Sequence, residues 1–469
     1  MISFSVENRD IILYNTIKNE RIDMERNIFS RIADWDRDMR RKPLILMGAR
    51  QVGKSWLMEE FAKRKYANDH VIVNLMDNER LRNGIEAGNL DPKAILSLIE
   101  LETDKTITPG KTLLIMDEIQ ESPRALTSLK FFQERMPELA IMAAGSLLGL
   151  ALRRGKSDKR KRPTASFPVG KVDFLDVQPM TFGEFLMATG EGRRLAKIQE
   201  ANWDILALQH DELTRLLKTY YFTGGMPEAV LEYSTSGNFQ RVRKVQKAIL
   251  RAYDEDFVKH ASPALLAKIR LLWNNIPAQL AKENKKFIYS ALRDGARARE
   301  YEEALQWLDD AAMIRILRRA SPPRMPLKAN EDFSAFKLFM HDVGLLAAMS
   351  DLPPQAILEG SAIFTNFKGA LTEQYVMQEL VGCGASPCYW SSERGDAEVD
   401  FLIQGTKSVL PVEAKAERNL NAKSLRVFRD LFAPPVSYRT SLAERHVGKD
   451  VYDIPLYAIP QIVKDACAR

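Results

Sequence analysis

The feature that most constrains the fold is an apolar run, Leu44 to Met47, that leads directly into a glycine-rich loop matching G-x-x-x-x-G-K-[ST]. The loop consists of Gly48, Ala49, Arg50, Gln51, Val52, Gly53, Lys54 and Ser55. A strand that feeds such a loop into a helix aims successive backbone N–H groups at one point, where the helix dipole adds positive potential. The sequence therefore predicts a polyphosphate site, with Lys54 reaching the β- and γ-phosphates and the Ser55 hydroxyl coordinating Mg²⁺.

A second apolar run, residues 113–116, ends in Asp117 and Glu118. Such a run is typical of a strand buried on both faces of a parallel sheet, and these sheets bind ligands at the carboxyl ends of their strands. We therefore expect Asp117 beside Ser55, holding the Mg²⁺ shell, and Glu118 placed to polarise a water for attack on the γ-phosphate. The alternative is that both carboxylates only cap the next helix. Both motifs, in this order, favour ATP binding.

Further strands complete the prediction of a doubly wound α/β domain. Residues 71–75 form one strand, and residues 139–144 form another that ends at Gly145 and Ser146. Ser146 is placed either to sense the γ-phosphate or to cap the following helix. Residues 166–172 and 179–186 suggest a last strand, a turn and a short helix.

Composition indicates a reducing compartment. Only Cys383, Cys388 and Cys467 occur in 469 residues, which argues against a disulfide scaffold. The N-terminus has no basic segment followed by an apolar one, and the apolar run at residues 139–152 is too short to span a bilayer. We expect a cytoplasmic protein with no membrane partner.

Positive charge is concentrated at residues 153–162, where lysine and arginine dominate. Such a block predicts a loop, which could contact a phosphate backbone, deliver an arginine to a neighbouring subunit's active site, or simply be solvated. The second use implies a homo-oligomer. The candidate arginines that follow Asp117 and Glu118 are Arg124, Arg153, Arg154, Arg160 and Arg162.

The middle of the chain is predicted to be mostly helical. The helical pattern up to residue 262 is interrupted at residues 224–227, with the next helix expected from Glu228. Residues 263–350 have the element order of a winged helix-turn-helix, which could read DNA near Arg293, Arg297 and Arg299 or bind protein. The expected elements are helices at residues 264–274, 276–283 and 299–311 and strands at residues 313–318 and 336–340.

Carboxylates gather in the last part of the sequence. Residues 396–403 and 410–415 predict a hairpin, in which alternation puts Asp400, Glu413 and Lys415 at strand ends or on one face. With Glu373 from a preceding helix, they could hold one or two Mg²⁺ or Mn²⁺ ions, and Lys415 could position a water for phosphodiester attack. The alternative is a salt-bridged hairpin of an ordinary α/β domain.

Several motifs in this order resemble the prokaryotic AAA-like ATPases (AAA_14) that carry a C-terminal domain of unknown function, DUF4143. The motifs are GARQVGKS at 48–55, DEIQ at 117–120, GMPE at 225–228, FKL at 336–338, DVGLL at 342–346, EVDF at 398–401 and VEAK at 412–415. The resemblance implies an ATPase module, a winged-helix segment and a PD-(D/E)XK nuclease-like module. One departure is that Glu398 and Val399, not a proline-aspartate pair, precede Asp400.

The sequence thus predicts an α/β protein with four parts. These are an AAA-like P-loop domain with a doubly wound parallel sheet (1–190), a helical lid or connector (191–262), a winged-helix-like domain (263–350) and a small α/β nuclease-like domain (351–469). We expect an Mg²⁺-dependent ATPase that acts on DNA. The alternative is a nucleotide-gated protein-interaction switch with a catalytically inactive nuclease fold.

Overall fold

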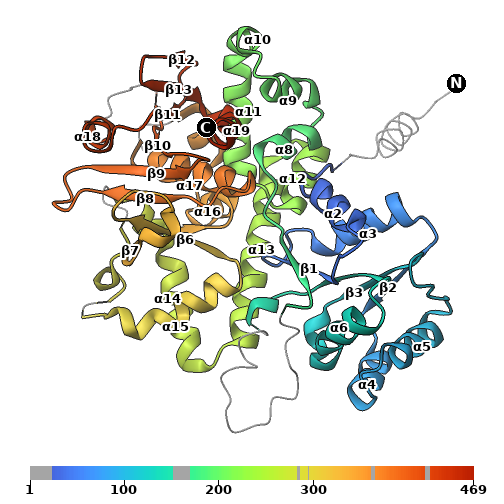
Figure 1. Cartoon of the computed structure of the whole chain (residues 1–469). Helices are drawn as coiled ribbons and strands as arrows, with labels where there is room; N and C mark the ends of the chain where they lie inside the picture. Colours follow the sequence, from blue (N-terminus) through green and yellow to red (C-terminus); the bar gives the residue numbers. More distant parts are fainter. Residues whose placement is uncertain are drawn as a thin grey trace, which may run out of the picture.

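Figure 1 shows the computed structural model of the chain, which describes residues 24–150, 170–282, 286–293, 295–360, 365–417 and 423–468. Two sheets organise these residues, one in the N-terminal part and one in the C-terminal part, and long helices run between them. Within the described ranges, no helix is both long and apolar enough to cross a bilayer.

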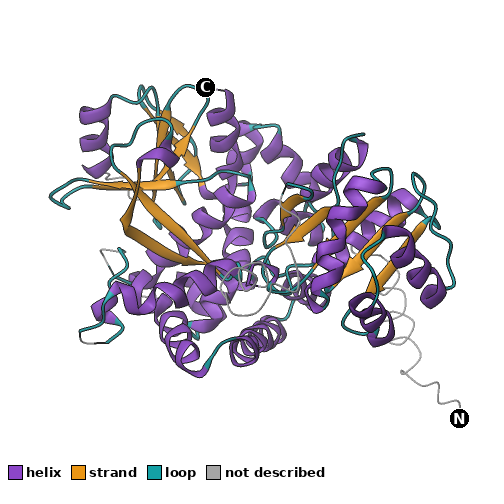
Figure 2. Ribbon diagram, turned by 60° about the horizontal axis from the view of Figure 1, so that its bottom comes forward, coloured by secondary structure: helices purple, strands orange, loops and turns teal. Residues whose placement is uncertain are grey.

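The first sheet has five parallel strands in the order β2-β3-β4-β1-β5. Figure 2 shows helices on both faces of this sheet. The strands are β1 (Leu44–Met47), β2 (His70–Asn74), β3 (Leu113–Asp117), β4 (Ala140–Ala144) and β5 (Asp173–Asp176). The helices of this part are α2 (Ile28–Arg37), α3 (Lys54–Tyr66), α4 (Glu79–Ala87), α5 (Pro92–Thr103), α6 (Pro123–Arg135) and α8 (Phe182–Ala188).

Alternate residues of these strands face two different cores. Leu113 and Ile115 of β3 belong to a cluster with α3, whereas Leu114 and Met116 belong to a cluster with α4, α5 and α6. A sheet covered on both faces needs apolar residues at every position of its central strands, which is why the run at residues 113–116 does not alternate. The predicted doubly wound α/β class is confirmed.

One predicted strand is misplaced. The last strand of this sheet, β5, lies at Asp173–Asp176 beside β1, not at residues 166–172. Residues 170–172 form a turn and bend, and residues 166–169 lie outside the described ranges. The β5 sequence itself alternates in burial, as expected for an edge strand, so it has a weaker apolar signal than the run before it.

The helical middle begins after α8. Its helices are α9 (Gly192–Gln199), α10 (Trp203–Leu208), α11 (His210–Thr223), α12 (Pro227–Ser236) and α13 (Phe239–His260). The expected break at residues 224–227 is present, and α12 starts at Pro227, one residue before the predicted start. Gly224 has φ +73°, and a Cβ there would lie 2.3 Å from the Asp342 Oδ1 atom, so this turn requires glycine.

The two short helices expected at residues 264–274 and 276–283 are one helix, α14 (Pro263–Leu280). Pro277 lies inside it, near the C-terminal end. The apolar face that includes Ile269, Trp273 and Ile276 is buried without interruption, so packing offsets the backbone hydrogen bond that a proline removes. The next helix, α15 (Ala298–Asp310), agrees with the predicted amphipathic helix.

The second sheet has eight strands in the order β12-β13-β11-β10-β9-β8-β6-β7. The strands are β6 (Ile314–Ala320), β7 (Glu331–Met340), β8 (Cys388–Ser391), β9 (Glu398–Gln404), β10 (Val409–Ala414), β11 (Ser437–Ser441), β12 (His446–Val447) and β13 (Val451–Pro455). The accompanying helices are α16 (Val343–Met349), α17 (Thr365–Gly382), α18 (Lys423–Phe432) and α19 (Ile459–Ala468). The predicted hairpin is confirmed, because β9 and β10 pair antiparallel.

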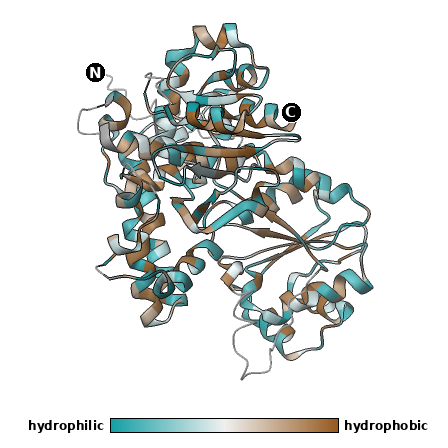
Figure 3. Cartoon of the chain, turned by 60° about the vertical axis from the view of Figure 1, so that its left-hand side comes forward, coloured by the Kyte–Doolittle hydropathy of each residue, from teal (hydrophilic) through white to brown (hydrophobic). Residues whose placement is uncertain are grey.

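The β6–β7 hairpin, which we expected to complete a winged-helix unit, is the edge of this sheet. β6 pairs with β8 through Arg319 and Tyr389. The sheet also curls, because the Phe339 ring of β7 lies 6.3 Å from the Phe401 ring of β9, three strands away in the sheet order. The hairpin therefore lies against the face of β9. The strands of both sheets are mostly apolar (Figure 3).

Candidate functional site

The glycine-rich loop has the backbone that its sequence predicts. Gly48 has φ +138°, and a Cβ there would lie 2.4 Å from the Val177 carbonyl oxygen, so only glycine fits. Gly53 has φ +92° and is followed at once by α3, which starts at Lys54. The N-terminal N–H groups of α3 therefore open onto the loop, as an anion site requires.

Lys54 is held inside the loop by neutral partners. Its side chain is buried, and Nζ donates to the carbonyl oxygens of Gly48 at 2.9 Å and Ala49 at 2.8 Å. Burial lowers the pKa of Lys54 to about 8, although Glu118 and Asp117 act in the opposite direction. No carboxylate of the described residues pairs directly with this ammonium group, so a phosphate would be favourable here.

Asp117 and Glu118 end β3 at the same edge of the sheet. Asp117 shares a hydrogen bond with the Ser55 side chain, and burial raises the pKa of the Asp117 carboxyl. Glu118 has φ +49°, a strained conformation for a residue with a side chain. The structure thus brings the predicted Ser55 and Asp117 together, and their oxygens suit Mg²⁺.

Glu118 is tied to Ser146 at the end of β4. Its Oε2 atom accepts from the Ser146 hydroxyl at 2.9 Å, from the Ser146 backbone N–H at 3.2 Å and from Gln120 Nε2 at 2.5 Å. Burial would raise the pKa of the Glu118 carboxyl, but these hydrogen bonds together outweigh it, so the pKa lies below its usual value. The carboxylate is therefore ionised at neutral pH and held by Ser146.

Arg50 joins the loop to the helical middle, a contact that sequence reasoning missed. Its Nη1 atom lies 2.5 Å from Oδ1 of Asp256 in α13, and Oδ2 of Asp256 is buried with no hydrogen-bond partner among the described residues. The Tyr253 hydroxyl lies 2.9 Å from the Arg50 carbonyl oxygen and 3.1 Å from His341 Nε2. His341 Nδ1 lies 2.9 Å from the carbonyl oxygen of Met313, just before β6. Hydrogen-bonding groups thus connect the phosphate loop to the second sheet.

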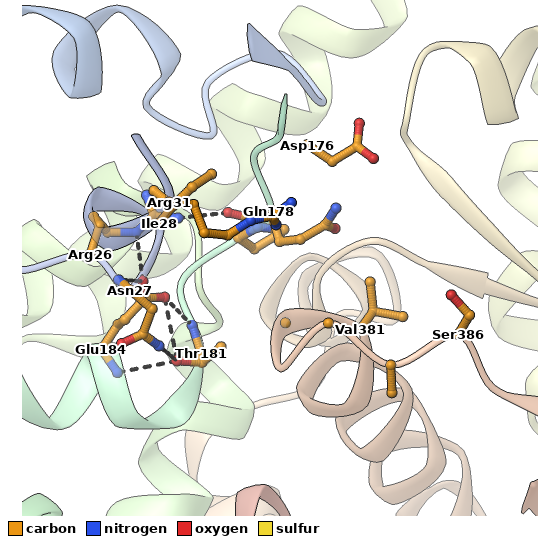
Figure 4. A pocket seen from close by; sticks show the side chains of 14 residues that line it. Arg26, Asn27, Ile28, Arg31, Asp176, Gln178, Thr181, Glu184, Val381 and Ser386 are labelled. Carbon is orange, nitrogen blue, oxygen red and sulfur yellow. Dashed lines mark hydrogen bonds and ion pairs between the residues drawn. The ribbon is translucent and has the colours of Figure 1, made fainter. Parts of the chain in front are cut away.

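A second missed residue, Arg26, supports the loop from the other side (Figure 4). It is buried and donates to the Val52 carbonyl oxygen at 3.2 Å, to the Gln178 carbonyl oxygen at 2.7 Å and to Glu184 Oε1 at 3.1 Å. Arg26, Gln178 and Glu184 line a cavity of about 300 Å³ between α2, the segment after β5, the last turn of α17 at Val381 and the chain that follows it at Ser386. The partners of Arg26 are too far away in the sequence for a local pattern to indicate them.

The predicted carboxylates of the C-terminal part also come together. Glu373 of α17, Asp400 of β9 and Glu413 of β10 are buried on one side of the second sheet. Lys415 Nζ lies 2.7 Å from Glu413 Oε1, and the Ala414 backbone N–H donates to Asp400 Oδ2 at 2.9 Å. Burial raises the pKa of the Glu413 carboxyl in spite of Lys415.

Lys337 of β7, which sequence reasoning did not identify, lies at the centre of this group. Its side chain is fully buried, and Nζ lies 2.5 Å from Glu398 Oε1, 3.7 Å from Glu373 Oε2 and 3.8 Å from Asp400 Oδ1. Burial would lower the pKa of Lys337, but the three carboxylates outweigh it and raise the pKa. Over the described ranges, no group of three or more His, Cys, Asp or Glu side chains is arranged to hold a metal ion. The sequence feature that could have identified Lys337 is its position as a charged residue inside the apolar run from Ala335 to Met340.

The remaining candidates are less informative. Arg124 donates within its own domain, to the carbonyl oxygens of Ile85 at 3.3 Å and Gly88 at 2.5 Å. Arg293 lies 3.7 Å from Glu300, so it is paired on the surface. The other arginine candidates, Arg153, Arg154, Arg160 and Arg162, lie outside the described ranges.

Three family models match successive parts of the sequence. Residues 40–186 match an AAA domain (AAA_14), residues 214–356 match a domain of unknown function (DUF8612), and residues 368–458 match another domain of unknown function (DUF4143). A search of curated proteins gives no significant match.

Solved structures of low sequence identity also match this chain. One is a Walker-type ATPase of Pyrococcus abyssi, with 16% identity and TM-score 0.44, covering 70% of this chain and 96% of that chain. Another is the ORC1 protein of Aeropyrum pernix in complex with DNA, with 13% identity and TM-score 0.30, covering 73% and 97%. A third is a STAND ATPase with a tetratricopeptide repeat sensor from Pyrococcus horikoshii, with 12% identity and TM-score 0.21, covering 74% and 47%.

Proposed function

Because the chain carries an AAA domain of the AAA_14 family and a DUF4143 domain, we propose that it is an Mg²⁺-dependent ATPase whose nucleotide state controls its C-terminal part. One observation carries this proposal: Lys54, Asp117 with Ser55, and Glu118 with Ser146 converge at the carboxyl edge of one parallel sheet. Each supplies a part that phosphoryl transfer needs.

Each of these residues would have a separate role in ATP hydrolysis. Lys54 would exchange its two carbonyl partners for phosphate oxygens, a stronger charge-assisted pairing. Ser55 and Asp117 would hold Mg²⁺, which neutralises charge on the phosphates when bound. Glu118, ionised and half-buried, would accept a proton from the attacking water once Ser146 and Gln120 release it.

Arg50 gives ATP a way to act on the rest of the chain. It belongs to the loop that surrounds the phosphates, and its ion pair with Asp256 reaches α13. A phosphate that attracts Arg50 would weaken this ion pair and leave the Asp256 carboxylate to rearrange. Differential affinity of ATP for the two arrangements would then shift the equilibrium between them.

Of the two roles expected for the C-terminal part, the switch is better supported than DNA cleavage. The buried Lys337 among the carboxylates is the observation that favours it. We propose a nucleotide-gated interaction switch, with DNA action as the competing outcome of the test.

The test measures phosphate release and ATP binding by purified protein with Mg²⁺. We expect slow hydrolysis in the wild type, no hydrolysis in Lys54→Ala, and no change in rate when duplex or single-stranded DNA is added. Absence of both ATP binding and hydrolysis in the wild type would refute the ATPase. Stimulation by DNA would keep the ATPase and replace the switch with a DNA-acting enzyme.

A further inference from the structure

We propose that the ammonium group of Lys337 is a built-in counter-ion that stands where the nuclease resemblance would place a divalent cation, so that the site takes no metal ion while Lys337 is present. The proposal concerns the C-terminal carboxylates alone and does not rest on the proposed ATPase activity.

The Lys337 ammonium group occupies the space between the carboxylates that a divalent cation would need. Lys337 Nζ lies within 3.8 Å of one oxygen from each of three carboxylates, two on β9 and one on α17. Divalent cations bind carboxylate oxygens at about 2.0–2.6 Å. An ion held between Glu373 and Asp400 would therefore lie within contact distance of the ammonium group, and the two positive charges would repel each other strongly in this buried place.

Lys337 is held in this position by its strand and by the packing around its side chain. Its backbone is paired with Leu317 in the centre of the β6–β7 hairpin, and its side chain is fully buried. Nζ also lies 5.1 Å from the centroid of the Tyr389 ring, a cation–π contact. Leaving this position would move an ammonium group away from three carboxylates and would require the strand or its packing to open.

The expected ligands Glu413 and Asp400 each have one oxygen engaged by the protein, whereas Glu413 Oε2 is buried without a hydrogen-bond partner among the described residues. Glu413 Oε1 pairs with Lys415 at 2.7 Å, and Asp400 Oδ2 accepts from the Ala414 N–H at 2.9 Å. Lys337 and Lys415 thus compensate part of the charge of these four carboxylates without a metal ion. This disagrees with the expectation that Glu373, Asp400 and Glu413 form a metal site.

The proposal makes an unusual prediction, that removing a lysine creates a cation site. In Lys337→Ala the carboxylates of Glu373, Glu398 and Asp400 lose their central charge and gain space, which favours a divalent cation. Lys328→Ala is the matched control, since Lys328 is an exposed lysine in the turn of the same hairpin and its loss changes net charge equally.

The experiment titrates nucleotide-free protein with Mn²⁺ and follows bound ion by electron paramagnetic resonance, together with the melting temperature. We expect Lys337→Ala to bind one Mn²⁺ more than Lys328→Ala and to regain part of its lost melting temperature on binding. Adding Asp400→Asn to Lys337→Ala should abolish both effects. The proposal fails if Lys337→Ala folds but binds no more Mn²⁺ than the double variant with Lys337→Ala and Asp400→Asn.

A second comparison keeps the proposal testable if Lys337→Ala does not fold. Wild type and Asp400→Asn should take up equal amounts of Mn²⁺, which supports a closed site. Greater uptake by the wild type would overturn the proposal, as would plasmid nicking by the wild type that needs Mn²⁺ and disappears in Asp400→Asn. Because nucleotide is absent throughout, neither result depends on whether the protein hydrolyses ATP.

Discussion

Among the residues that the structure describes, two buried lysines lie beside carboxylates, and they differ in what surrounds the ammonium group. Lys54 donates to backbone carbonyl oxygens, with Asp117 and Glu118 near but bound to other side chains. Lys337 has three carboxylate oxygens within 3.8 Å. Burial lowers the pKa of Lys54, whereas in Lys337 the carboxylates outweigh burial and raise it.

We call the Lys54 site open, because its ammonium group donates to neutral carbonyl oxygens, and the Lys337 site closed, because carboxylates surround its ammonium group. Burying an ammonium group without a paired anion is unfavourable in free energy, and a phosphate that binds to the group reduces this penalty. An ammonium group surrounded by carboxylates has already obtained that stabilisation from the protein itself. Sequence motifs alone cannot make this distinction, because both sites contain lysine, aspartate and glutamate at strand ends.

The largest expected effect is on stability, and it separates the two lysines directly. Lys337→Met leaves the buried Glu373 and Asp400 and the half-buried Glu398 without their counter-charge, so we expect it to lower the free energy of unfolding by about 3–5 kcal/mol. Lys54→Met removes a charge that the apo protein holds at a cost, so its unfolding free energy should stay within about 1 kcal/mol of the wild type or rise. Thermal melts without nucleotide measure both.

Lys328→Met, on the surface of the β6–β7 hairpin, is the control for this pair and should melt like the wild type. If Lys337→Met is as stable as the wild type while Lys54→Met is strongly destabilised, the contrast between the two sites is reversed and must be abandoned.

The next effect concerns catalysis at the open site. Glu118→Gln keeps the shape of the side chain but removes the base, so we expect hydrolysis to fall roughly 100-fold, about 2.7 kcal/mol, with ATP affinity retained. Glu121→Gln, three residues along the chain, makes the same chemical change outside the site and should keep wild-type turnover. Steady-state phosphate release and nucleotide titration check this. Wild-type turnover in Glu118→Gln would remove Glu118 from the mechanism.

Local sequence patterns were sufficient for much of this site. The phosphate loop, the positions of Asp117, Glu118 and Ser146, and the β9–β10 hairpin each depend on a short segment whose backbone is set by its own glycines or apolar periodicity. The contacts between Arg26 and Glu184, between Arg50 and Asp256, and between Lys337 and Glu398 join separate elements, and only the tertiary fold brings them together. The uninterrupted helix α14 was missed for a related reason, because packing overrode the local effect of Pro277.

A pH titration sharpens the contrast further. The pKa of Lys54 is about 8 in the free protein, and a bound phosphate would raise it, so ATP binding takes up a proton above that pH. Affinity should be constant below pH 8 and then fall with rising pH, by up to about tenfold per unit, or about 1.4 kcal/mol. Calorimetry between pH 7.5 and pH 9.5 in buffers of different ionisation enthalpy would detect the proton.

Lys54→Arg is the control for the titration, because a guanidinium group does not titrate in this range. Its ATP affinity, even if weaker, should not change with pH. If the ATP affinity of the wild type stays constant or rises between pH 7.5 and pH 9.5, Lys54 is not the titrating group.

The smallest effect tests whether the open site communicates with the second sheet through Tyr253. Burial lowers the pKa of His341 to about 4, so the ring is neutral and has one proton, which Nδ1 donates to the Met313 carbonyl oxygen. His341 Nε2 is then an acceptor, and the single Tyr253 proton can go either to Nε2 or to the Arg50 carbonyl oxygen. The hydroxyl therefore has two alternative arrangements, one tied to the phosphate loop and one tied to the second sheet.

Tyr253→Phe removes this choice and keeps the ring. We expect ATP to change the hydrogen exchange of residues 313–341 less than in the wild type, with a coupling loss of about 1 kcal/mol, the usual net value of one hydrogen bond. Tyr457→Phe is the matched control, because the Tyr457 hydroxyl also lies 3.1 Å from a buried histidine, His210, and over the described residues it has no hydrogen bond to the phosphate loop. Equal exchange in Tyr253→Phe and the wild type would mean that the ATP site influences the second sheet by another route, such as the Arg50–Asp256 ion pair alone.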